Sequence, residues 1–262
     1  MNAPPATATS LLSDLHALGV PEGGVVLVHS SLSRLGWIVG GAQAVVMALV
    51  EAVGGPTGTI VMPTHSSDLT EPSHWRHPAV PKEWWDAVRE FAPAYDRRLT
   101  PTRGMGAVVE CFRHLDGVER SGHPSSSFAA WGRRAQQIAG DHALESAFGE
   151  RSPLARIYDL DGWALLLGVG HASNTSLHLA EHRASYPGKE QVNLGAPVLV
   201  EGARTWIAYS DLHPDGEDFE ALGEAFDATG AVREGTVGAG PARLMKQRDL
   251  VDFGAGWIER HR

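Results

Sequence analysis

Three short apolar runs, each ending in polar residues, constrain the fold more than any other feature of the sequence. They read VVLVHSS at 25–31, TIVMPTHSSD at 59–68 and WALLLGVGH at 163–171. Runs this short and this apolar are typical of strands buried on both faces of a sheet. Segments with helical spacing of apolar residues lie between them. The alternation predicts an α/β fold with a mixed central sheet sandwiched by helices.

The remaining elements follow from periodicity, turn residues and length. The hairpin at 192–211 is expected to turn at Glu201 and Gly202. We expect a further strand at 104–112 and helices at 9–19, 40–55, 83–92, 129–142, 152–160, 175–184, 218–230 and 241–262. Residues 68–104 are otherwise loop-rich. Because the sequence contains no repeat, low-complexity tract or linker, we expect residues 1–262 to form a single domain.

Composition excludes several classes of function. The net charge of −9 argues against a nucleic-acid partner, because no basic stripe is present to contact phosphates. It is compatible with a cationic small molecule. The single cysteine, Cys111, cannot form an internal disulfide framework or a thiolate cluster, and we expect a buried, inert thiol. With neither a signal peptide nor an apolar run of ~20 residues, we expect a cytoplasmic monomer or homodimer without a membrane partner.

The sequence TSLHLAEHRA at 175–184 places two histidines and a glutamate within about one helical turn. As H-x-x-E-H, it would let His178 and His182 bind zinc while Glu181 acts as the base of a hydrolase. Alternatively, His178 and Glu181 are neighbours at i and i+3, and the carboxylate makes the imidazole a better general base. An ordinary exposed His–Glu pair is the third possibility. The spacing alone leaves all three open.

Two glycine-bearing segments suit a ligand that lies along the backbone. The segment LVHSSLSRLGWIVGG, at 27–41, places hydroxyls and glycine amides beside a helix start, where phosphate or pantetheine groups can bind. The segment TPTRGMGAVVE, at 100–110, offers closely approachable glycines that an extended acyl carrier could contact. No G-x-S-x-G nucleophile elbow is present, and GVGHAS after the third apolar run is a weak dinucleotide signal.

Taken in order along the chain, these motifs resemble the aminoglycoside 3-N-acetyltransferase family, antibiotic acetyltransferases that are not of the GNAT type. The segments that carry the resemblance are LVHSSLSRLGWIVGGAQAVVMAL, GTIVMPTHSSD, RGMGAVVE, RSGHPSSSFAAWG, SPLARIYDLDGWALLLGVG, NTSLHLAEHRA and RLMKQRDLVDFGAGWI. They extend over nearly the whole chain. The resemblance implies an α/β domain of the antibiotic N-acetyltransferase type. It also implies transfer of acetyl from the cosubstrate acetyl-CoA to an amine of a polycationic aminoglycoside, without a metal or an acyl-enzyme, giving resistance.

The resemblance also implies roles for individual residues. His178 would be the catalytic base supported by Glu181, and His29 would lie close to the thioester. The predicted coenzyme A site consists of Ser30, Ser31, Ser33, Leu35, Gly36, Thr102, Arg103, Gly104, Met105, Gly106 and Phe112. The acidic side chains expected to face the substrate amines are Asp68, Glu217 and Asp218. Acetylation of a primary amine that is not an antibiotic stays open as an alternative, as does the zinc hydrolase.

Overall fold

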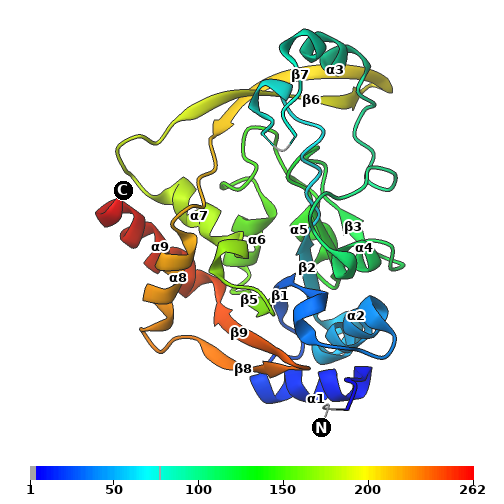
Figure 1. Ribbon diagram of the computed structural model, residues 1–262, viewed down its shortest axis with the longest axis vertical. Helices are drawn as coiled ribbons and strands as arrows, with labels where there is room; N and C mark the ends of the chain where they lie inside the picture. The colour runs from blue at the N-terminus through cyan, green and yellow to red at the C-terminus, as the bar shows by residue number, and fades with distance from the viewer. Residues whose placement is uncertain (1–3, 77) are drawn as a thin grey trace.

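The central sheet brings the three apolar runs side by side (Figure 1). The computed structural model describes residues 4–76 and 78–262. In spatial order the strands are β3 (Glu119–Arg120), β4 (Phe128–Gly132), β2 (Thr59–Pro63), β1 (Val25–Ser30), β5 (Trp163–Leu167), β9 (Gly240–Lys246) and β8 (Arg233–Val237). β1 pairs in parallel with both β2 and β5, and the outer pairs are antiparallel. The expected mixed α/β sheet is confirmed.

Each face of the sheet has its own hydrophobic core, because side chains alternate along the strands. In β1, Val26 and Val28 enter one core, and Val25 and Leu27 enter the other. The first core is covered by α1 (Ala8–Leu18), α2 (Gly41–Ala52) and α4 (Ala107–Phe112). The second is covered by α5 (Ala135–Ala139), α6 (Pro153–Asp159), α7 (Ser176–Arg183), α8 (Phe219–Asp227) and α9 (Gln247–His261).

A separate two-stranded hairpin stands beyond the end of the sheet, at the top of Figure 1. It consists of β6 (Gln191–Val200) and β7 (Ala203–Leu212), and it lies beside α3 (Trp85–Phe91). The hairpin turns where predicted, at Glu201 and Gly202, both with positive φ. The 3₁₀ turns are η1 (Leu32–Leu35), η2 (Gly55–Thr57), η3 (Pro72–His74), η4 (Lys82–Trp84) and η5 (His171–Ser173).

Three expected elements are wrong in type or extent. Residues 104–112 form α4 instead of a strand, because Val108, Val109 and Phe112 bury one helical face against α2. Cys111 is half-buried in this helix. The expected helix at 129–142 begins as β4, and the expected helix at 241–262 begins as β9. Short β-branched runs are ambiguous between the two structures when only periodicity is considered.

The carboxyl ends of the three parallel strands open at one edge of the sheet. His29 and Ser30 at the end of β1 lie opposite Leu166 and Leu167 of β5. The loops that follow β2 and β5 leave from the same edge. Sites in open α/β sheets gather at such edges, so the fold places the predicted polar residues together. Within the described residues, no helix combines the length and apolarity needed to cross a bilayer.

Candidate active site

Two adjoining hollows occupy this edge of the sheet. The first, here named the histidine cavity, has a volume of about 540 Å³, and its lining includes His29, His65, His123 and His178. The second, the serine cleft, has a volume of about 730 Å³ and runs along η1 and the segment before α4. Both hollows are lined by Ser30, Gly104, Met105, Val169 and Ser173. A two-part ligand or two substrates can therefore meet at the shared residues.

The central feature of the histidine cavity is the pair formed by His178 and Glu181 on α7. The His178 Nδ1–H donates to Glu181 Oε2 over 2.9 Å, and the Glu181 side chain is fully buried. The other oxygen, Oε1, accepts from Arg262 Nη1 at 2.7 Å and from the Asp215 amide at 3.0 Å. Both oxygens are thus held, and the His178 ring is fixed through its Nδ1.

Charge and packing fix this pair in one arrangement. Burial raises the pKa of Glu181, but the hydrogen bond and charge of His178, together with the hydrogen bond from Arg262, bring that pKa below its usual value. The carboxylate is therefore anionic at neutral pH. The His178 ring stacks on Phe148, with 4.7 Å between centroids and 18° between planes, and meets Phe219 edge-on. These contacts hold the imidazole in the orientation that a general base requires.

His29 reaches the same cavity from the end of β1. Its Nε2 lies 3.3 Å from the Thr175 hydroxyl, and burial lowers the pKa of His29 to about 3. The ring is consequently neutral at physiological pH. It can orient a ligand through a hydrogen bond.

The structure brings most of the predicted coenzyme A residues into the serine cleft. The cleft is lined by Ser30, Ser31, Ser33, Gly36, Gly104, Met105 and Gly106. Gly36 has φ of +81°, and a Cβ there would lie 2.8 Å from the Ala239 Cβ, so the tight path of the loop requires glycine. Leu35 and Phe112, by contrast, are buried in the core and do not reach the cleft. Their side chains support the segments that line it.

Two further members of that predicted set lie beside the cleft and contact protein groups. Thr102 donates through both its amide and its hydroxyl to Glu110. Arg103 forms an ion pair with Asp68. Neither Thr102 nor Arg103 is among the residues that line the serine cleft. Their proposed contact with coenzyme A stays a prediction.

The three predicted substrate carboxylates do not line the histidine cavity. Asp68 is paired with Arg103, and Asp218 is paired with Arg262 at 2.6 Å. Glu217 is exposed, and its amide donates to Asp215. Asp68 was predicted from its motif, and Glu217 and Asp218 were predicted from their charge. Neither signal indicates which arginine pairs with a carboxylate in the folded protein.

Several lining residues were not predicted. His65 and His123 lie within motifs that the sequence displayed, PTHSSD and GHPSSS, so their position after or near a strand was a usable signal. Tyr209 and Asp211 enter the cavity from β7, which alternation alone could not assign to a site. Arg262 lies 81 residues from Glu181 in sequence, and no local pattern marks it.

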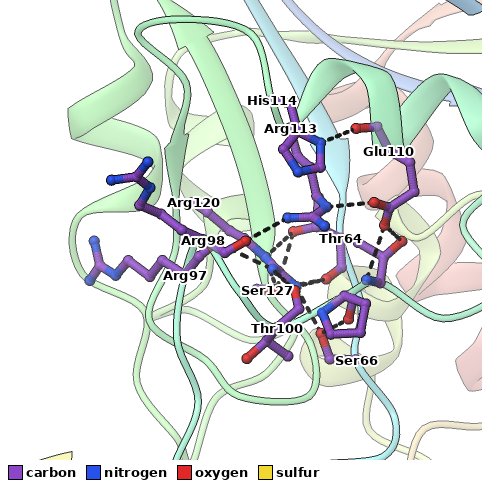
Figure 2. Close-up of polar contacts among 12 residues, drawn as sticks. Thr64, Ser66, Arg97, Arg98, Thr100, Glu110, Arg113, His114, Arg120 and Ser127 are labelled. Carbon is purple, nitrogen blue, oxygen red and sulfur yellow. Dashed lines mark hydrogen bonds and ion pairs between the residues drawn. The ribbon is translucent and has the colours of Figure 1, made fainter.

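Figure 2 shows the polar contacts of a buried arginine, Arg120. The Arg120 guanidinium donates to the Thr64 carbonyl and the Ser66 hydroxyl, each at 2.7 Å. It also donates to the Thr100 carbonyl at 2.5 Å and the Ser127 hydroxyl at 3.0 Å. The side chain therefore ties the end of β2 to the loop that leads into the serine cleft. In the described part of the chain, none of its hydrogen-bond acceptors is a carboxylate.

The geometry does not suit the zinc interpretation of H-x-x-E-H. A zinc hydrolase uses the glutamate as a base on metal-bound water, but both Glu181 oxygens are occupied by His178, Arg262 and a backbone amide. His182 is not among the residues that line the histidine cavity. Over residues 4–76 and 78–262, no group of three or more His, Cys, Asp or Glu side chains is arranged to hold a metal ion.

Known proteins are similar to this chain in sequence and in fold. The family model described as aminoglycoside 3-N-acetyltransferase matches residues 27–259. The chain belongs to that family, whose members are acyltransferases. It is 46% identical over 255 residues to the SPbeta prophage-derived aminoglycoside N(3')-acetyltransferase-like protein YokD of Bacillus subtilis (strain 168), covering 97% of this chain and 93% of the relative. It is 38% identical to aminoglycoside N(3)-acetyltransferase VII of Streptomyces paromomycinus, covering 97% and 92%.

Solved structures of the family superpose along the whole chain. The crystal structure of YokD from Bacillus subtilis matches with a TM-score of 0.96 and 45% identity, covering 99% of this chain and 96% of that one. AAC-IIIb in a binary complex with CoASH matches at 0.87 and 32%, covering 98% and 97%. AAC-VIa bound to sisomicin matches at 0.87 and 34%, covering 99% of each chain. The fold expected from the resemblance is confirmed.

Proposed function

We propose that this acetyltransferase transfers the acetyl group of acetyl-CoA directly to a primary amine, with His178 as general base, and that the 3-amino group of an aminoglycoside is an acceptor, giving antibiotic resistance. The buried His178–Glu181 pair facing the histidine cavity carries the proposal. Family membership supports the acceptor, and the relative solved with CoASH supports the cosubstrate. The proposal places the enzyme in the cytoplasm, as a single-domain monomer or homodimer.

The reaction needs two bound substrates and one proton acceptor. Acetyl-CoA lies in the serine cleft with its thioester at the residues that both hollows share, and the amine enters the histidine cavity. As the amine nitrogen bonds to the acetyl carbon, His178 Nε2 takes the proton, and Glu181 stabilises the imidazolium. The C–S bond then breaks, and the coenzyme A thiolate leaves. A backbone N–H from a glycine at the shared edge can hold the developing oxyanion.

Direct transfer requires no protein nucleophile. Neither hollow has a cysteine among its lining residues. Cys111 is half-buried against the core on α4. Because the coenzyme A thiolate is a good leaving group, positioning and one general base are sufficient for the reaction. Such a base contributes about 10²–10⁴ in rate.

Thiol release from acetyl-CoA in the presence of sisomicin tests the proposal. We expect drug-dependent release by the parent enzyme. We expect His178→Ala to lose most turnover while coenzyme A binding is retained, and Glu181→Gln to lose less, because that glutamate acts through the histidine. Full activity in His178→Ala would refute the assigned base. If Glu181→Gln lost as much as His178→Ala, the carboxylate would have a more direct role than orienting the ring.

A second acceptor class, a primary amine that is not an antibiotic, is favoured by one specific observation. Among the residues lining the histidine cavity there is a single carboxylate, that of Asp211, and it is already hydrogen-bonded to the backbone. A panel of amines in the same thiol-release assay tests this class directly.

A further inference from the structure

The wall of the histidine cavity is largely apolar. Aliphatic and aromatic side chains reach it from both cores, from the loop before α4 and from the hairpin. They include Met105, Val109, Phe148, Val169, Val192 and Leu194. A cavity of this volume and lining suits a small organic molecule with an apolar portion.

Negative charge is scarce among the residues that form this wall. Asp211 is 2% exposed, its Oδ2 accepts from the Ala147 amide at 2.7 Å, and its Oδ1 accepts from the Leu212 amide at 2.7 Å. Glu190 lines a neighbouring depression on the hairpin, outside the cavity, and Glu71 in that depression is paired with Arg89. Among the residues that the structure describes, the cavity lining therefore offers no freely accessible carboxylate.

Three histidines of the wall, His29, His65 and His123, do not supply charge of either sign. Burial lowers the pKa of His29 and of His65 to about 3 and that of His123 to about 4. These rings are neutral at physiological pH. They can exchange hydrogen bonds with a hydroxyl or a neutral amine, but they do not balance an ammonium group.

These features discriminate between classes of acceptor. The reacting amine must be the free base, so that group enters the cavity without charge. An aminoglycoside carries several further amines that are mostly protonated at neutral pH. Bringing an ammonium group to an apolar wall without a counter-charge is strongly unfavourable. A molecule with a single amine avoids that penalty.

We propose that the histidine cavity takes a primary amine carried on an otherwise uncharged, partly apolar body, and that such an amine is a better acceptor than a polycationic aminoglycoside. This inference rests on the proposed function, since it names the acceptor of the same acetyl transfer. It extends the activity to substrates outside the aminoglycosides.

The first test compares 2-phenylethylamine with sisomicin in the thiol-release assay at low and high salt. We expect kcat/KM for the monoamine to exceed that for sisomicin by about tenfold or more, as expected for leaving an ammonium group unpaired. We also expect the KM of the monoamine to be insensitive to salt. A higher kcat/KM for sisomicin would overturn the inference.

Calorimetric binding to the CoASH-loaded protein separates failure of the inference from failure of the proposed function. If the monoamine binds more tightly than sisomicin but no thiol is released with either, the cavity preference stands and the acetyl transfer is refuted. If sisomicin binds more tightly, the inference is refuted whether or not turnover occurs.

A variant of the hairpin gives a gain-of-function test. Leu194 on β6 is half-buried, lines the cavity and lies opposite Tyr209 of β7. Leu194→Glu introduces the missing carboxylate, and Leu194→Gln is the matched uncharged control. We expect the KM for sisomicin to be about fivefold lower in Leu194→Glu than in Leu194→Gln. Equal KM values for sisomicin in the two variants would contradict the electrostatic argument.

Discussion

Arg262 is the residue through which the catalytic pair can be perturbed without altering either of its members. Its guanidinium bonds Glu181 Oε1 at 2.7 Å and Asp218 at 2.6 Å, and its side chain is only 12% exposed. It also donates to the Asp215 carbonyl, which orders the segment next to the histidine cavity. We predict that Arg262→Met moves the acidic limb of the pH–rate profile to higher pH.

The direction follows from the response of the fully buried Glu181 to the loss of its cation. The hydrogen bond from Arg262 is one of the contacts that hold the pKa of Glu181 below its usual value, against the effect of burial. Without that contact Glu181 gains a proton at a higher pH than before, and His178 loses its anionic partner over the same range. The competent state, with a carboxylate beside the imidazole, therefore requires higher pH.

The magnitude can be worked from the burial of the pair. Removing one partner of a buried ion pair costs about 3–5 kcal/mol. If about half of that acts on the proton affinity of the catalytic pair, the shift is about one to two pH units at 1.36 kcal/mol per unit. The remainder should lower the free energy of unfolding, so the assay is run well below the melting temperature of the variant.

The assay is kcat/KM for the amine against pH, for the variant and the parent with the same acceptor. Because the acceptor amine titrates identically in both experiments, the difference between the profiles belongs to the protein. Arg262→Lys keeps the charge and should restore most of the parent profile. Arg260→Met, at an exposed neighbouring position on α9, should leave the profile unchanged. Superimposable profiles for Arg262→Met and the parent would refute the reasoning.

Three further predictions concern stability and metal dependence. The pKa values of His29 and His123 are lowered to about 3 and about 4, so between those values and 6.5 the unfolded chain binds more protons. The free energy of unfolding in urea should therefore fall by about 2 kcal/mol per histidine from pH 7 to pH 5, and a flat profile would contradict the assigned burial. Arg120→Lys removes several hydrogen bonds of a buried cation and should lower the free energy of unfolding by about 3 kcal/mol. Arg98→Lys, at an exposed position, should leave the free energy of unfolding in urea nearly unchanged. EDTA should leave the acetyl-transfer rate unchanged, and a loss restored by zinc would revive the metal interpretation.

The parallel centre of the sheet was predictable because its apolar runs are short and bounded by turn residues, which favours strands over buried helices. β1, β2 and β5 are continuous apolar runs, and each is flanked by turn residues. The segment at 104–112 was not predictable, since two adjacent valines fit a strand as well as the buried face of a short helix. β8 and the start of β9 were missed for a related reason. β8 is mostly exposed, so its sequence has no apolar run.

Local spacing predicted the contact between His178 and Glu181, but it did not predict the surroundings of that pair. His178 and Glu181 are three residues apart, and a helix necessarily brings them together. The contacts that make Glu181 effective come from Arg262 and from the Asp215 amide, which only the tertiary fold brings to α7. Two of the predicted substrate acids, Asp68 and Asp218, illustrate the same limit, since each is paired with an arginine that no local pattern identifies.

The two halves of the site are therefore built in different ways, and this bears on what family membership implies for the acceptor. The His178–Glu181 pair lies within one helix turn. The edge of the sheet at which the thioester is proposed to lie is formed by strand ends, whose positions the sheet fixes. The histidine cavity combines β6, β7 and the loops after β2 and β5, so its charge depends on a few side chains from distant segments. One carboxylate placed on the hairpin would change that charge without disturbing the catalytic pair. Acetyl transfer is thus the property that relatives of this fold can share most readily, whereas the acceptor must be determined from the cavity of each chain.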